Sequence, residues 1–304
     1  MIITTSMRTD IPAYYSRWFF NRIKEGYVLV RNPYHPELIN RYELNTDVVD
    51  CLLFCTKNPI PMLSRLDEIS QFNQYWYVTI TAYGKDIEPN VPDKRYVIEA
   101  FKKLSLRYGP KAVCWRYDPI AYGMGYDHKR HVETFKKIAE ELDGYTNAIG
   151  MSFMDLYEKT IRNAPLLRRP SEQEQIALLK ELVPIAKSHG MVIRFCTKNQ
   201  HLAETGVDLQ GCQTQDVFYE AIGWKLLTKP GPNCPCLMGR DIGVYNSCPH
   251  LCKYCYANYS KEEVAKSFAA HDPNSPLLIG WLGPDEKIIQ GKQKQERDFK
   301  VSLF

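Results

Sequence analysis

The sequence has few of the features that direct a protein to a membrane or to nucleic acid. Its apolar runs, such as residues 48–54, are far too short to span a bilayer, and no basic segment followed by an apolar one opens the chain as in a signal peptide. Lysine plus arginine number 39 against 35 for aspartate plus glutamate, so no strong positive charge favours phosphate backbones or anionic lipids. We therefore expect a globular, cytoplasmic protein that does not associate with membranes.

Several common catalytic motifs are also missing. No Gly-x-Gly-x-x-Gly follows the first predicted strand, which argues against a dinucleotide-binding open sheet, and the lack of a Walker-type glycine loop argues against phosphoryl transfer. No serine has the flanking glycines of a nucleophile elbow, which argues against a serine hydrolase. His128 and His131 lie close together on a predicted helix, but no carboxylate is placed to complete a metal triad with them.

What the sequence does contain is an alternation of strand-like and helix-like segments. The predicted strands are short, apolar and rich in β-branched or aromatic residues, and they cover residues 2–6, 48–55, 75–82, 112–117, 148–153 and 191–196, with a seventh candidate at 241–245. Parallel neighbours need crossover connections, which are usually helices, so the alternation predicts an α/β fold. We favour a complete or partial TIM-like (β/α) barrel over residues 1–228. A cysteine-rich, cluster-binding segment follows at residues 229–304, with a C-terminal helix and a charged tail that we expect to be solvated.

The predicted helices begin at recognisable capping residues. Asp10 precedes the first helix-like segment, Ser171 and Glu174 have the spacing of a capping box, and residues 260–263 repeat that spacing. We expect Pro184 to kink or interrupt the helix that begins near Ser171, because proline removes a backbone donor.

The ten cysteines are unevenly distributed along the chain. In a reducing compartment, clustered cysteines indicate metal ligands or reactive thiols and not a disulfide framework. Cys51, Cys55 and Cys114 lie in apolar, strand-like stretches and are predicted to be buried core residues. The other seven cysteines all fall between residues 196 and 255, where we expect the chemistry.

Cys248, Cys252 and Cys255 have the spacing C-x3-C-x2-C, the most informative feature of the sequence. Three thiolates on one short loop can bind three corners of a cubane iron–sulfur cluster and leave the fourth iron open to a ligand. Structural zinc sites instead use two C-x2-C pairs or a Cys/His set that closes all four positions. The spacing favours a [4Fe-4S] cluster, while His250 leaves a closed zinc site as the alternative.

Four further cysteines give enough ligands for a second metal or cluster: Cys196, Cys212, Cys234 and Cys236. A Cys-x-Cys pair whose partners are distant in sequence is compatible with more than one kind of site. The alternative is a loop stiffened by proline that carries incidental thiols.

The chain resembles two known families. Over nearly its whole length it resembles a microbial family catalogued as domain of unknown function "eighteen forty-eight", on the stretches SMRTDIPAYYSRWF at 6–19, RNP at 31–33, TKNP at 56–59, TAYGKDIEPN at 81–90 and DIGVYNSCPHLCKYCYAN at 241–258. The cysteine run, with Tyr254 directly before Cys255, resembles the cluster loop of radical S-adenosylmethionine enzymes. In most of those enzymes the loop follows the first barrel strand; here it comes last, which a permuted barrel would explain. No Gly-Gly-Glu-like stretch, which usually holds the methionine amine, follows a strand.

The second resemblance implies a function. Cys248, Cys252 and Cys255 would hold a [4Fe-4S] cluster with S-adenosylmethionine on the open iron, and Tyr254 would pack near its adenine. One electron, from a donor such as a ferredoxin or flavodoxin, would cleave S-adenosylmethionine to a radical that abstracts hydrogen from a small-molecule substrate. We take two neighbours of the loop as further cofactor-binding candidates, Tyr256 and Asn258.

If the barrel is correct, the loops after its strands converge on one mouth, and function should lie there. The polar residues at these strand ends are our candidate catalytic residues: Arg8, Asp10, Lys57, Asn58, Lys85, Arg116 and Asp118. Each has an ordinary alternative, since Asp10 can cap a helix, residues 56–59 can form a turn, and Arg116 with Asp118 can be a structural ion pair.

Two other classes of function remain open. The cluster could be closed by a fourth ligand, Cys234 or Cys236, in an electron-transfer or non-catalytic protein, or a zinc-stabilised barrel could bind a small ligand. The Tyr-Cys-Tyr-Ala run at 254–257 is similar to one in spore photoproduct lyases, which makes a nucleic-acid substrate a minor alternative that the charge balance does not favour.

Overall fold

The computed structural model describes residues 1–231 and 234–298. Its centre is a seven-stranded sheet in the order β11-β1-β4-β5-β6-β7-β8, in which all neighbours are parallel. These strands are β1 (Ile2–Thr4), β4 (Cys51–Thr56), β5 (Gln74–Thr79), β6 (Val113–Ile120), β7 (Ala148–Phe153), β8 (Val192–Arg194) and β11 (Arg240–Asp241). The predicted α/β class is confirmed, and each predicted strand, the seventh candidate included, overlaps a strand of this sheet. Because the order is linear, β8 and β11 form two edges and the described sheet is open.

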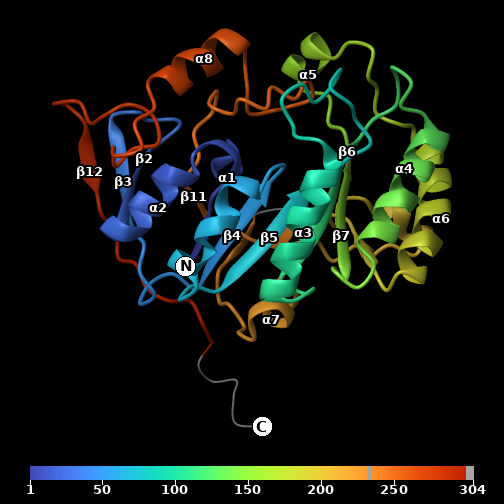
Figure 1. Cartoon of the computed structure of the whole chain (residues 1–304), viewed down its shortest axis with the longest axis horizontal. Helices are drawn as coiled ribbons and strands as arrows, with labels where there is room; N and C mark the ends of the chain where they lie inside the picture. The colour runs from blue at the N-terminus through green and yellow to red at the C-terminus, as the bar shows by residue number, and fades with distance from the viewer. Residues whose placement is uncertain (232–233, 299–304) are drawn as a thin grey trace.

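Helices cover the two faces of the sheet unequally (Figure 1). One face packs against α2 (Ser16–Glu25), α3 (Lys94–Tyr108), α4 (His128–Glu141) and α6 (Glu172–Ser188). There Trp76 stacks on Phe54 at 4.0 Å and Trp115 on Phe135 at 4.9 Å between ring centroids. The other face packs against α7 (Gln215–Ile222) through Phe218. Since both faces are buried, the strands are nearly continuous apolar runs in the sequence.

A second sheet was not predicted from the sequence. It has the order β12-β3-β2 and consists of β2 (Tyr27–Arg31), β3 (Leu38–Glu43) and β12 (Lys287–Ile289). It lies at one side of the molecule in Figure 1, beyond α2. Because β11 joins the large sheet and β12 joins the small one, the segment after residue 229 is part of both sheets.

The predicted helix starts are confirmed. The Asp10 carboxylate accepts the Ala13 N–H at the start of α1 (Ile11–Tyr14), the capping box at Ser171 begins α6, and Ser260 caps α8 (Lys261–Ala269). Of the kink or interruption expected at Pro184, the interruption is wrong, because α6 continues through this residue. Pro184 is on the exposed side of the helix, where water can satisfy the carbonyl that loses its donor.

Short elements complete the chain: α5 (Glu158–Asn163), the 3-10 helices η1 (Ile60–Ile69) and η2 (Gln200–Thr205), and the hairpin strands β9 (Pro230–Gly231) and β10 (Cys234–Leu237). Contrary to the expectation of a solvated tail, the described part of the tail packs beside the N-terminus. The Asp50 carboxylate accepts the Glu296 N–H at 2.7 Å and the Arg297 Nε–H at 3.1 Å. Within residues 1–231 and 234–298, no helix has both the length and the apolar character to cross a bilayer.

Candidate functional site

A cavity of about 350 Å³ lies where the carboxyl ends of the central strands meet the cysteine loop, which we define as residues 248–255. Strand-end residues line one part of it and the cysteine loop another. All three loop cysteines line this cavity: Cys248, Cys252 and Cys255. Candidate residues predicted from the sequence also line it: Arg8, Asp10, Lys57, Arg116, Asp118 and Tyr254. The carboxyl edge of a parallel sheet is where such folds bind ligands.

The cysteine loop is held in place by backbone and side-chain hydrogen bonds. It follows β11, which pairs with β1, so the last strand in the sequence brings the loop beside the first. The Asn258 amide donates to the Cys248 carbonyl at 2.8 Å, and the Ala257 N–H donates to Cys255 Sγ at 3.3 Å. Leu251, between the first two cysteines, has φ 55°, a left-handed conformation that a branched side chain rarely adopts. The backbone is therefore strained at this point of the cysteine loop.

The loop thiols are shielded from water. Cys248 and Cys252 are each 9% exposed and Cys255 is half-buried. Burial raises the pKa of all three thiols, most strongly for Cys248, while Lys57 opposes the rise at Cys252. Burial therefore favours the neutral form of these thiols, and a metal or cluster would displace their protons when it binds.

Asp10 connects the loop to the sheet. Its buried carboxylate accepts the Thr56 hydroxyl at 2.7 Å, the Lys57 N–H at 2.8 Å, the Ala13 N–H at 3.1 Å and His250 Nε2 at 2.9 Å. One side chain thus joins the start of α1, the end of β4 and the cysteine loop. Asp10 is the helix cap that the sequence suggested, and it is also a clamp on the loop.

His250 is fully engaged in this clamp. Because a carboxylate only accepts, Nε2 must carry the proton that is shared with Asp10, and Nδ1 lies 3.1 Å from the Tyr14 hydroxyl. The ring is 2% exposed. Neither ring nitrogen is free in this arrangement to complete a Cys₃His zinc site.

Lys57 forms a buried ion pair that the sequence did not reveal. Its ammonium donates to Glu88 at 2.9 Å, and Glu88 also accepts from the Tyr254 hydroxyl and from the Thr81 hydroxyl at 2.9 Å. Burial by itself would raise the pKa of Glu88, but Lys57 beside it holds that pKa below its ordinary value. Tyr254 is therefore fixed through its hydroxyl at the cavity wall.

Arg116 and Asp118 form a second polar group within β6. The guanidinium donates to Asp118 and, at 2.8 Å, to Cys55 Sγ, and Ser152 donates to the other carboxylate oxygen of Asp118. Burial alone would lower the pKa of Arg116, but the Asp118 carboxylate raises it well above its ordinary value. Cys55 was expected in the core; it is half-buried and lines the cavity instead.

The other candidate residues are more dispersed. Arg8 reaches the cavity and pairs with Asp241, at 2.5 Å from Nε to Oδ2. Tyr256 also lines the cavity, and its hydroxyl donates to the Met7 carbonyl. Three candidates lie outside the lining, and their side chains bind backbone groups instead: Asn58 accepts the Ile60 N–H at 3.2 Å, Lys85 donates to the Val91 carbonyl, and Asn258 binds Cys248.

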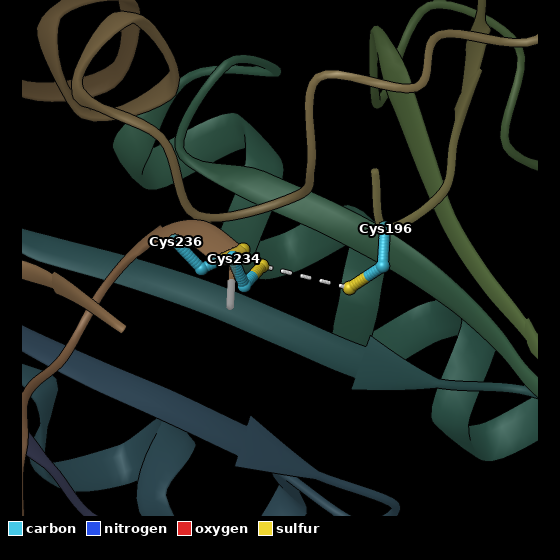
Figure 2. A group of neighbouring side chains, drawn as sticks. All are labelled: Cys196, Cys234 and Cys236. Atoms are coloured by element: carbon cyan, nitrogen blue, oxygen red, sulfur yellow. Dashed lines mark hydrogen bonds between the residues drawn. The ribbon is translucent and has the colours of Figure 1, made fainter. Parts of the chain in front are cut away.

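A second group of cysteines lies beside the site (Figure 2). The sulfur atoms of Cys196, Cys234 and Cys236 are all within 4.8 Å of one another, and Cys212 follows Gly211, where an added Cβ would lie 3.2 Å from Cys236 Sγ. Hydrogen bonds from the neighbouring thiols, that of Cys196 first, hold the pKa of Cys236 well below its ordinary value. Cys196 and Cys212 line an adjoining cavity of about 190 Å³, which shares Arg116 with the first.

The sequence reasoning missed Glu88 and Asp241 as members of the site. Glu88 lies within the stretch at 81–90 that carries the family resemblance, and Asp241 is in the predicted seventh strand. Their roles depend on the partners Lys57 and Arg8, which are far from them in sequence.

An α/β protein with a polar, cysteine-lined cavity at the carboxyl edge of its sheet is the class that the geometry defines. The chain belongs to the family described as Domain of unknown function (DUF1848), whose family model matches residues 2–257 and so includes all three loop cysteines. None of the curated proteins compared with the chain matches it.

Proposed function

We propose that this protein is an iron–sulfur enzyme of the radical S-adenosylmethionine type, built on a partial (β/α) barrel. The observation that carries the proposal is that one short loop contributes Cys248, Cys252 and Cys255 to a single cavity at the carboxyl edge of the parallel sheet. A cluster held there would supply the one-electron cleavage of S-adenosylmethionine and so hydrogen abstraction from a substrate.

The spacing of the loop sulfurs supports a cluster over a single ion. Three thiolates on one tetrahedral zinc, each about 2.3 Å from the metal, lie about 3.8 Å apart. Among the described residues, the sulfur atoms of Cys196, Cys234 and Cys236 all lie within 4.8 Å of one another. Those of the three loop cysteines do not. A cubane binds its thiolates through different irons, which sets them farther apart.

The surroundings of the loop favour an open fourth position. His250 is held by Asp10 and Tyr14, and Cys234 and Cys236 group with Cys196 and are not part of the cavity lining. Within the described chain, no further cysteine or histidine besides Cys55 and His250 lines the cavity with the three thiols. These contacts weigh against both the closed cluster and the Cys₃His zinc site.

The place of the loop supports the permuted barrel. It follows the edge strand β11, and β1, β4, β5, β6, β7 and β8 succeed one another from that edge. The cysteine loop thus follows the strand that is first in the spatial order of the sheet, although this strand is the last of the seven in the sequence.

The polar lining suits a ligand with both charges. Arg8, Arg116 and Lys57 supply positive groups, and Asp118 with Asp155 supplies carboxylates. In the absence of a Gly-Gly-Glu element, we assign the recognition of the methionine amine to these carboxylates. A volume of about 350 Å³ lies within the range of small-molecule sites, and a ferredoxin or flavodoxin of the cytoplasm is the electron donor that we propose.

Anaerobic turnover tests this proposal. Incubation of the purified protein with S-adenosylmethionine and dithionite should yield 5′-deoxyadenosine and methionine. Cys252→Ala should abolish both products, whereas Cys51→Ala, a buried cysteine on β4 outside the cavity, should retain them. Formation of 5′-deoxyadenosine by the Cys252 variant at the wild-type rate would refute the proposal.

A further inference from the structure

The second group of cysteines comes from three separate segments. Cys196 follows β8, Cys212 precedes α7, and Cys234 and Cys236 lie on β10. Figure 2 shows the side chains of Cys196, Cys234 and Cys236 converging across the space between these segments. Segments so far apart in sequence do not bring thiols together without a reason in packing or in ligation.

The spacing of these thiols matches one tetrahedral ion. The Sγ atoms of Cys196 and Cys234 lie 3.7 Å apart, and Cys236 Sγ is within 4.8 Å of both. Zinc bonded to thiolates at about 2.3 Å places them about 3.8 Å apart. A disulfide needs sulfurs about 2.05 Å apart and joins only two of them, so it does not account for three mutual neighbours.

Cys212 is the candidate for the fourth donor, because it follows Gly211, which lies against Cys236, and its backbone carbonyl accepts the Tyr77 hydroxyl. Its Sγ is not among the three sulfurs that lie within 4.8 Å of one another, so its side chain would turn toward them when an ion binds. The preceding Gly211 has φ +106°, and a Cβ there would lie 3.2 Å from Cys236 Sγ. Glycine at this position avoids a close contact between a Cβ and the Cys236 sulfur and allows the turn that presents Cys212.

We propose that Cys196, Cys212, Cys234 and Cys236 bind one zinc ion that ties together the two edges of the parallel sheet. Cys196 lies just after the edge strand β8, and Cys236 lies just before the opposite edge strand β11. In the described sheet these two edge strands do not pair with each other, so the metal–thiolate bonds would link them. With four protein donors the site is structural, and the thiol protons are released as the ion binds.

The surroundings can hold the charge of such a site. Four thiolates on a divalent ion leave a net charge of about −2. Arg116 and Arg194 line the adjoining cavity together with Cys196 and Cys212. Arg116 also lines the larger cavity, so the zinc would fix a wall that the two cavities share.

Metal analysis of the anaerobically purified full-length protein tests the proposal. The wild type should contain about one zinc per chain. Cys236→Ala should lose this zinc and keep its iron and sulfide, whereas Cys252→Ala should keep the zinc. Because zinc and iron are lost in different variants, failure of the radical proposal and failure of this one are distinguishable. Cys51→Ala is the matched control and should keep both metals.

A titration of the wild type with Co²⁺ after removal of zinc covers the case in which Cys236→Ala does not fold. The intense thiolate-to-cobalt charge-transfer absorption of a tetrahedral four-thiolate site should appear and saturate at about one Co²⁺ per chain. Amide exchange in β8 and β11 should be faster without the ion than with it. Absence of the absorption, absence of zinc from the wild type, or loss of iron and sulfide in place of zinc from Cys236→Ala would each overturn the proposal.

Discussion

Replacing Asp10 with alanine should loosen the cysteine loop while the sheet stays folded. The change removes an N-cap, worth about 1 kcal/mol. It also leaves the Lys57 N–H and the ring of His250 without their buried acceptor, at about 1–3 kcal/mol each. We expect a loss of stability on the order of 4 kcal/mol. For a chain of 304 residues this corresponds to a fall in Tm of about 6 °C.

Asp93 provides the matched control. It caps α3 by accepting the Arg95 N–H at 2.9 Å, but its side chain is 42% exposed and binds only its own helix. Thermal melts and iron content are measured for Asp10→Ala and Asp93→Ala in parallel. The first should melt much lower and lose iron during desalting, and the second should do neither. Equal melting temperatures and equal iron retention would refute the assignment of Asp10 as the clamp of the loop.

Three further predictions concern buried polar groups. His131 is buried, which lowers its pKa to about 4. The unfolded chain binds this proton near pH 6.5, so stability should fall by about 3 kcal/mol as the pH drops from 6.5 to 4, and His131→Gln should flatten that slope in denaturant titrations. Glu88→Gln should lower the free energy of unfolding by about 3–5 kcal/mol because it leaves Lys57 charged and unpaired. Adding Lys57→Met to this variant should restore much of the lost stability. Arg116→Lys should weaken S-adenosylmethionine binding at least about tenfold, measured by equilibrium dialysis, with iron content unchanged.

Each of these predictions has a contrary result. If the stability of His131→Gln fell with pH as steeply as that of the wild type, groups other than His131 would account for the loss of stability in acid. Additive losses for Glu88→Gln and Lys57→Met would show that the two side chains do not interact. If Arg116→Lys bound S-adenosylmethionine with wild-type affinity, the guanidinium would not be part of the ligand site.

The large sheet could be predicted from the sequence because its strands are buried on both faces. Residues 148–153 were predicted with the bounds that β7 has, and the other strands within a few residues. The small sheet could not be predicted, since β12 pairs with β3 across some 250 residues and no local pattern encodes that pairing. The path of α6 through Pro184 likewise depends on which side of the helix faces water.

Parts of the site followed from position alone. Asp10 and Lys57 follow strands and Arg116 lies within β6, and the parallel sheet brings them to one cavity. Asn58 and Lys85 occupy similar positions, yet their side chains bind nearby backbone groups. Loop conformation decides between these outcomes, and a single sequence does not specify it. The cysteines were singled out by their spacing and uneven distribution along the chain, and the structure brings Cys196, Cys234 and Cys236 together from separate segments.

The most direct test of the central claim is the spectrum of the anaerobically reconstituted cluster with and without S-adenosylmethionine. We predict about four iron and four sulfide per chain at Cys248, Cys252 and Cys255, and a change in the electron paramagnetic resonance of the reduced cluster when S-adenosylmethionine is added. Zinc in place of iron at these three cysteines, or a cluster whose resonance does not respond, would contradict the account.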